Sequence, residues 1–99
     1  MVEVLKSLKG QSNRVLSSEM PRQMLIPQLG LGGVGFNVII QGGLTCFGHP
    51  GWNEGFHNML LACPEIGQGI IWMTNGENGR NLGYEVDRGL AEVVGWSWW

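Results

Sequence analysis

The sequence has no excess of either charge and no long apolar run. Six Lys and Arg residues stand against eight Asp and Glu residues, which gives a formal net charge of -2. A nucleic-acid-binding surface needs a basic patch that neutralises phosphates, so nucleic acid is not an expected partner. No apolar stretch approaches the roughly 20 residues of a membrane span, so no membrane span is expected. The start at Met1 mixes acidic and basic residues at helical spacing, unlike a signal peptide, and the compartment stays open.

Cysteine is also scarce. Cys46 and Cys63 are too few for a fold held by several disulfides, and nothing in their spacing fixes them as a pair. We interpret both as small buried apolar residues. The 99 residues allow a single domain, 1–99, with a thin margin of stability, because so short a chain buries only about two thirds of its surface on folding.

The middle of the chain is almost free of charge. The only charged residue between Gln23 and Pro64 is Glu54, although 14% of all residues are charged. Such a gap is expected of elements covered on both faces, and it is typical of the interior of a larger structure. The 17 glycines indicate tight turns and close backbone approach, since the apolar content is too high for a solvated coil.

Two short helices are expected at the start of the chain. The first ends at Gly10. Ser17 can cap the second, Pro21 is tolerated in its first turn, and Pro27 stops it. The apolar residues at helical spacing are Val2, Leu5 and Leu8 in the first helix, and Met20, Met24 and Leu25, expected to face the core, in the second.

From Gly30 onward short apolar runs alternate with turn residues, as in a sheet. Connections this short join antiparallel neighbours. The last run has no polar alternation, which predicts a strand buried on both faces. The expected strands are 31–40, 44–49, 56–63 and 69–74, and the expected turns are 41–43, a corner at 50–54, and 64–68.

A third helix is expected after the turn residues at 75–79, and it ends at Gly95. Its apolar residues at helical spacing are Leu82, Val86, Leu90, Val93 and Val94. The sequence therefore predicts an α+β fold, with an antiparallel sheet of about three to four strands flanked by N- and C-terminal helices.

No cofactor or metal site is expected. Residues 30–35 match the glycine spacing of a dinucleotide-binding fingerprint, but a helix precedes them and a strand follows, whereas the fingerprint needs strand, turn and helix. Cys46, His49, His57 and Cys63 offer the donor atoms of a structural zinc site. Cys46 and His49 differ by an odd number along one expected strand, so they point to opposite faces and cannot converge.

The end of the chain is rich in tryptophan. Trp96 is expected to pack against the core. Trp98 and Trp99 could be core filling, a ligand platform or a membrane-interface anchor, and the sequence leaves these roles open.

One segment, 47–56, carries a more specific pattern. Its letters, Phe-Gly-His-Pro-Gly-Trp-Asn-Glu-Gly-Phe, resemble the strand-end motif of serine hydrolases of the β-lactamase and penicillin-binding-protein type. The third catalytic box of that family is Lys-Thr-Gly in many members and His-x-Gly in the esterase-like branch. The order of later elements, from Pro64-Glu65 through the apolar strand to a closing helix, is similar to the C-terminal part of the family. The resemblance covers nearly the whole chain and implies that the sheet and helices are part of a β-lactamase-like fold.

The resemblance implies a catalytic half-site at His49, Gly51 and Trp52. His49 would contribute polarity to the substrate and to the catalytic hydrogen-bond network. Gly51 would let an acyl group lie against the strand, and the backbone amide of Trp52 would be one of two oxyanion donors. The other donor would be the amide of the nucleophile itself. Without the resemblance, the favoured interpretation of His49 is a strand-end histidine satisfied by a backbone carbonyl, because a lone histidine is weak evidence of a site.

The nucleophile of that family is absent from this sequence. No serine has a lysine three positions later, as Ser-x-x-Lys requires, and Tyr84 is not followed by x-Asn. Acyl transfer needs an activated nucleophile within reach of a base, so the chain is expected to be inactive alone.

Two functions remain in view. The first is a C-terminal fragment of a β-lactamase-like serine hydrolase, which acts on esters, amides or β-lactams in the intact family. The alternative is a non-enzymatic oligomerisation or ligand-binding module that retains the fold. In both, the strand at 69–74 would have an unpaired edge, so a homo-oligomer or a missing N-terminal part of the same fold is the expected partner.

Overall fold

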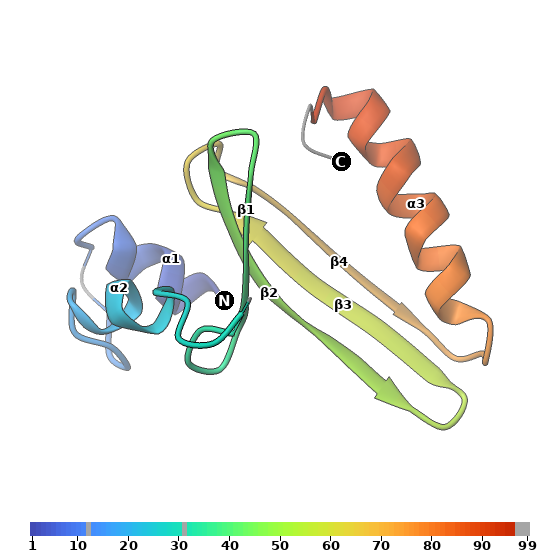
Figure 1. The fold of residues 1–99 in the computed structure, drawn as a ribbon, viewed down its shortest axis with the longest axis horizontal. Coiled ribbons are helices and arrows are strands. Elements are labelled where there is room, and N and C mark those ends of the chain that lie inside the picture. The colour runs from blue at the N-terminus through green and yellow to red at the C-terminus, as the bar shows by residue number, and fades with distance from the viewer. Residues whose placement is uncertain (12, 31, 97–99) are drawn as a thin grey trace.

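The computed structural model describes residues 1–11, 13–30 and 32–96. It is an α+β structure, with one four-stranded antiparallel sheet in the order β1-β2-β3-β4 and helices at both ends of the chain (Figure 1). This confirms the predicted fold class. The elements are α1 (Val2–Leu8), α2 (Met20–Met24), β1 (Asn37–Gln41), β2 (Leu44–Asn53), β3 (Phe56–Cys63), β4 (Gln68–Thr74) and α3 (Gly79–Val94).

The sheet separates two sets of helices. On one face α3 packs along β3 and β4, and we call this the α3 face. On the other, α1 and the segment around α2 cover Phe47 and Ala62 near the β1 end of the sheet, and we call this the α1–α2 face. No helix among the described residues is long and apolar enough to cross a membrane.

The N-terminal helices form as predicted, and Leu5, Leu8 and Leu25 pack against the core as expected, but the most buried residues are others. Val4 and Ser7 are the buried residues of α1, and the Ser7 hydroxyl donates to the carbonyl of Ser17 at 2.6 Å. Val2, expected on the inner face, is exposed. In α2 the buried residue is Pro21, whereas Met20 is exposed, because the helix has a single turn and only one side of it meets α1.

The strand boundaries differ from the prediction at two places. β1 begins at Asn37, because residues 32–36 form bends and isolated bridges, and Leu31 lies outside the described residues. β2 does not turn at 50–54 but continues to Asn53, and the turn is Glu54–Gly55. Pro50 is compatible with a strand here, because it lies opposite Met59 in a pair that exchanges no backbone hydrogen bonds.

The two cysteines form a disulfide, which corrects their interpretation as separate buried residues. They occupy directly opposite positions of β2 and β3, one step beyond the Phe47–Ala62 pair. With Leu61 and Ile70 they form the small core under α3. The spacing gave no sign of this pairing, because it depends on the register between two strands.

We predict that removal of the disulfide destabilises the protein. The bond closes a loop between residues 17 positions apart, and loss of such a cross-link costs about 3 kcal/mol through the entropy of the unfolded chain. Urea unfolding of the Cys46→Ser/Cys63→Ser variant should show this loss relative to the oxidised parent. The reduced parent, with its thiols counted by mass spectrometry, is the control. Equal stability of all three forms would contradict the pairing.

β4 is not buried on both faces. Ile70 and Trp72 face α3, but Ile71 and Met73 point to the other face and are 67% and 79% exposed. The strand lies at the edge of the sheet, and α1 and α2 contact only the opposite end of that face. The continuous apolar run is therefore covered on one face only.

The third helix packs on the sheet with a different side from the predicted one. Its buried residues recur every four positions and are small or polar: Gly79, Gly83, Asp87 and Ala91. The apolar residues predicted to face the core, Leu82, Val86, Leu90, Val93 and Val94, are all exposed. The reason is the Trp72 side chain, whose ring lies where a Cβ on Gly83 would be, so only a residue without a side chain fits there. Gly95 ends the helix in a left-handed conformation, as predicted.

Two glycines of α3 test this packing. Gly83→Ala should lower stability by about 1–3 kcal/mol, because its methyl group would overlap the Trp72 ring. Gly89→Ala is the matched control, since nothing lies near that position, and it should raise stability by up to about 1 kcal/mol through helix propensity. Thermal unfolding followed by circular dichroism measures both. The same change in stability for both substitutions would show that the side of α3 with Gly79, Gly83, Asp87 and Ala91 does not face the sheet.

Candidate functional site

Near its end at Asn53, β2 directs the backbone amide of Trp52 away from the neighbouring strand β3. Directly opposed residues of antiparallel strands alternate between pairs that exchange hydrogen bonds and pairs that do not. The two-residue turn closes on the hydrogen-bonded pair Asn53–Phe56, so the next pair, Trp52–His57, exchanges none. Counted back along the strands, the same alternation makes Cys46–Cys63 a pair without hydrogen bonds. Their Cα atoms are 4.2 Å apart, a separation typical of such a pair. The amide of Trp52 therefore points away from β3.

No strand of the described part of the chain occupies the space toward which that amide points. β1 pairs with β2 only as far as the Asn37–Gly48 pair, and β2 continues beyond it (Figure 1). Among the described residues, 49–53 have a strand partner only on the β3 side. The end of β2 is thus an open strand edge with the Trp52 N–H directed outward.

The structure divides the three residues of the predicted half-site between faces. By strand alternation the His49 side chain lies on the α1–α2 face, Gly51 is at a position of that same face, and the side chain of Trp52 lies on the α3 face. His49 is exposed, and its Nδ1 lies 2.5 Å from the carbonyl oxygen of Pro50. A Cβ at Gly51 would overlap the side chain of Asn58 opposite. Only the backbone of Trp52 lies at the same edge as His49 and Gly51.

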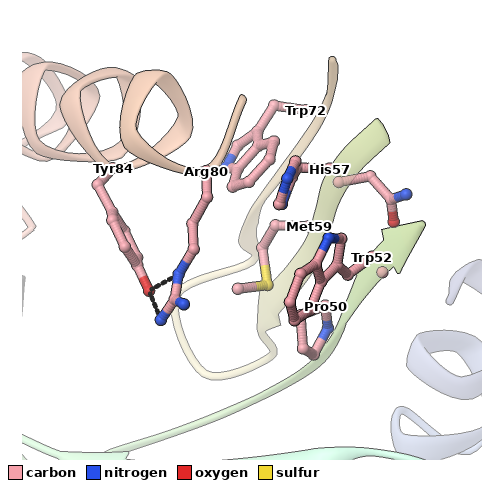
Figure 2. A pocket seen from close by; sticks show the side chains of 9 residues that line it. Pro50, Trp52, His57, Met59, Trp72, Arg80 and Tyr84 are labelled. Atoms are coloured by element: carbon pink, nitrogen blue, oxygen red, sulfur yellow. Dashed lines mark hydrogen bonds between the residues drawn. The ribbon is translucent and has the colours of Figure 1, made fainter. Parts of the chain in front are cut away.

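A cleft opens on the α3 face at the same end of the sheet. Its volume is about 350 Å³, and it lies between the N-terminal half of α3 and the β2–β3 hairpin (Figure 2). Aromatic and apolar side chains make most of its wall. The lining residues are Pro50, Gly51, Trp52, His57, Asn58, Met59, Trp72, Arg80 and Tyr84.

His57 is the most enclosed polar group of this aromatic cleft. Its ring stacks on the Trp52 indole, with 5.7 Å between ring centroids and 19° between planes. The residue is 9% exposed, and its Nε2 atom is buried without a hydrogen-bond partner among the described residues. A buried nitrogen left unpaired is costly, so a group that reached this atom and bonded to it would remove the cost.

Asp87 of α3 holds in place the side chain of Trp72, which lines the cleft. Its Oδ1 accepts a hydrogen bond from the Trp72 indole N–H at 3.0 Å, and its Oδ2 is buried without a partner among the described residues. Burial raises the pKa of the Asp87 carboxyl above its ordinary value, and the bond from Trp72 opposes this shift.

Arg80 supplies the positive charge of the cleft. Both Nε and an Nη donate to the Tyr84 hydroxyl, at 3.1 and 3.0 Å, and the guanidinium lies 5.4 Å from the Tyr84 ring centroid. Across the described ranges it forms no ion pair with a carboxylate. The cation is held in place while some of its N–H groups remain free.

Sequence reasoning placed Trp52 at a site but missed the cleft. His57, Trp72, Arg80 and Tyr84 come from three different elements, and no local motif joins them. Strand alternation combined with the antiparallel register would have put the first two on one face. The four-residue spacing of Gly79, Gly83, Asp87 and Ala91 was the available signal for the α3 face.

Neither the glycine-rich segment nor the set of four cysteines and histidines forms the site that its pattern suggests. Residues 32–36 are bends that lead into β1, without the helix a dinucleotide fingerprint needs. Cys46 and His49 do lie on opposite faces of the sheet, and both cysteine sulfurs are in the disulfide, so the four donors do not form a zinc site. Trp96 packs against the core under α3 as expected, whereas Trp98 and Trp99 lie outside the described residues.

Comparison with family models, with curated proteins and with solved structures finds no match for this chain. The site is therefore interpreted from its own geometry.

Asp87 should make stability depend on pH. Because its folded pKa is raised, the folded state binds the proton more tightly, so stability falls as pH rises from the ordinary value of 3.8 through the folded pKa. Asp87→Asn keeps an acceptor for Trp72 without the buried charge, so it should lose this fall and be at least as stable at pH 7.

Chemical unfolding at several pH values measures the effect of Asp87. Asp87→Ala should cost about 1–3 kcal/mol at acidic pH, because it leaves the Trp72 N–H unpaired, and less at pH 7, where the parent carries the buried charge. Glu92→Gln, an exposed carboxylate of the same helix, is the control and should behave as the parent. An Asn variant with an unchanged pH profile would contradict the role of Asp87.

Proposed function

We propose that this chain is the C-terminal part of a serine hydrolase of the β-lactamase and penicillin-binding-protein type. One observation carries the proposal: the Trp52 amide points outward from an open strand edge, directly after the His-x-Gly box. An outward N–H at an unpaired edge can donate to the oxyanion of an acyl-transfer intermediate. The α+β architecture and the sequence resemblance support the same interpretation.

His49 and Gly51 have complementary roles in this proposal. His49 is exposed on the α1–α2 face next to the open edge, where its ring can interact with a substrate that lies along β2. Gly51 follows on the same face, where the Asn58 side chain fills the space beside it, so an acyl group that lies against this strand would contact the Asn58 amide. The substrate would thus contact β2 from the edge and from the face opposite to α3.

The half-site does not complete a catalytic mechanism. A second oxyanion donor and the nucleophile belong to a Ser-x-x-Lys segment, and the 99 residues contain none. Half an oxyanion hole cannot turn over an ester or a β-lactam, because no covalent intermediate forms without the nucleophile. We therefore propose that the isolated chain is inactive.

The uncovered apolar surface indicates a missing partner. Ile71 and Met73 of β4 are exposed beside the outer edge of the sheet, and the apolar side of α3 is exposed as well. An edge strand with exposed apolar residues is a ready template for strand addition. We propose that a second copy of the chain, or an N-terminal part of the same fold, covers this surface.

A non-enzymatic module is the second candidate. The observation in its favour is the aromatic cleft on the α3 face, whose lining residues do not include His49. In that case the fold serves oligomerisation or ligand binding, and the open edge of β2 has no catalytic role.

Light scattering combined with a fluorescent fluorophosphonate probe tests the first proposal. The sample should have the mass of a dimer or higher oligomer, carry no covalent label, and hydrolyse a chromogenic ester and a chromogenic β-lactam no faster than buffer. A serine β-lactamase treated in parallel is the positive control. A labelled chain would contradict the missing nucleophile, and an unlabelled monomer would contradict the proposed self-association.

The DNA upstream of Met1 separates the two candidates. An in-frame segment that encodes Ser-x-x-Lys supports the hydrolase fragment. An upstream sequence without it favours the non-enzymatic module.

A further inference from the structure

We infer that the aromatic cleft on the α3 face binds a planar aromatic carboxylate. This inference goes beyond the proposed hydrolase half-site, because the cleft lies on the other face of the sheet from His49 and needs no nucleophile. It depends on three features of the cleft: flat apolar walls, one unpaired cation and one unpaired buried nitrogen.

The walls are suited to a flat ring. Trp52 and Trp72 flank the cleft from different strands, and Met59 lies between them (Figure 2). Trp52 is 79% exposed, although His57 fixes one of its faces by stacking. A ring that enters the cleft would remove this exposed indole surface from water and add aromatic contacts, both of which favour binding.

The charge of the cleft selects an anion. Among the described residues that line it, Arg80 is the one with a full positive charge, and none has a carboxylate side chain. Tyr84 holds the guanidinium in place through two hydrogen bonds, which reduces the entropy lost when the remaining N–H groups bind a ligand. A guanidinium with free N–H groups fits the two oxygens of a carboxylate.

His57 provides a second polar contact. Its Nε2 is buried and unpartnered among the described residues, and the ring lies between Trp72 and Trp52 in the wall of the cleft (Figure 2). With the proton on Nε2, the ring donates to a carboxylate oxygen and satisfies an atom that the protein leaves unpaired. Apolar walls with a few convergent polar groups are typical of small-molecule sites.

The size of the cleft sets the size of the ligand. Its volume of about 350 Å³ is at the lower end of the range for small-molecule pockets, which suits one or two fused rings with a single acidic group. Sodium 2-naphthoate has this form, and 2-naphthylmethanol is its uncharged analogue.

NMR titration of the full chain with both compounds tests the inference. We expect saturable shifts of the Trp52 and Trp72 indole signals and of the His57 ring with 2-naphthoate, and binding roughly tenfold or more weaker with 2-naphthylmethanol, because the charged hydrogen bonds are lost. Arg80→Gln should reduce 2-naphthoate binding to the level of the alcohol. Arg88→Gln is the matched control, since Arg88 lies on the same helix but is exposed and paired with Glu85, and it should bind as the parent does.

A second variant keeps the test independent of Arg80. Trp52→Ala should weaken 2-naphthoate binding several-fold by removing one aromatic wall, and the exposure of this side chain means that the fold should persist. Equal binding of the acid and the alcohol, no effect of Trp52→Ala, or absence of saturable binding would overturn the inference. None of these results depends on labelling by the serine-reactive probe, so the two proposals fail separately.

Discussion

The antiparallel register of β2 against β3 is the constraint on which the rest of the structure depends. It begins beside the Cys46–Cys63 disulfide and ends at the two-residue turn after Asn53. A slip of β2 by one residue would exchange the two faces of that strand. His49 would then lie under α3, and the side chain of Trp52 would leave the aromatic cleft. The open edge and the cleft are thus two results of a single strand pairing.

The sequence predicted the α+β class, β3 to the residue and the glycine that ends α3, because these depend on local patterns. It did not predict the orientation of α3. An amphipathic helix is expected to bury its large apolar residues, but here Trp72 fills the space above the sheet and only Gly83 fits against it. The cysteine pairing and the course of β2 through Pro50 were missed for a related reason, since both follow from the partner strand rather than from neighbours along the chain.

For the candidate site, the His-x-Gly box drew attention to the end of β2 at which the Trp52 amide lies on the open edge. Local pattern could not show that β1 pairs with β2 only as far as the Asn37–Gly48 pair, which is what leaves the Trp52 amide at an open edge. Nor could it bring together an arginine of α3, a histidine of β3 and tryptophans of two strands. Charge, stacking and burial in the cleft come from tertiary packing, and each of its residues has an unremarkable setting along the chain.

The position of the disulfide has a topological consequence for the hairpin. Cys46 and Cys63 enclose the whole tip of β2 and β3, including Trp52 and His57. A protease that cuts the chain in the Glu54–Gly55 turn would therefore produce two polypeptides that stay covalently joined. The open edge and one wall of the cleft would remain on the same molecule after such a cut, as two chains with the paired strands still side by side.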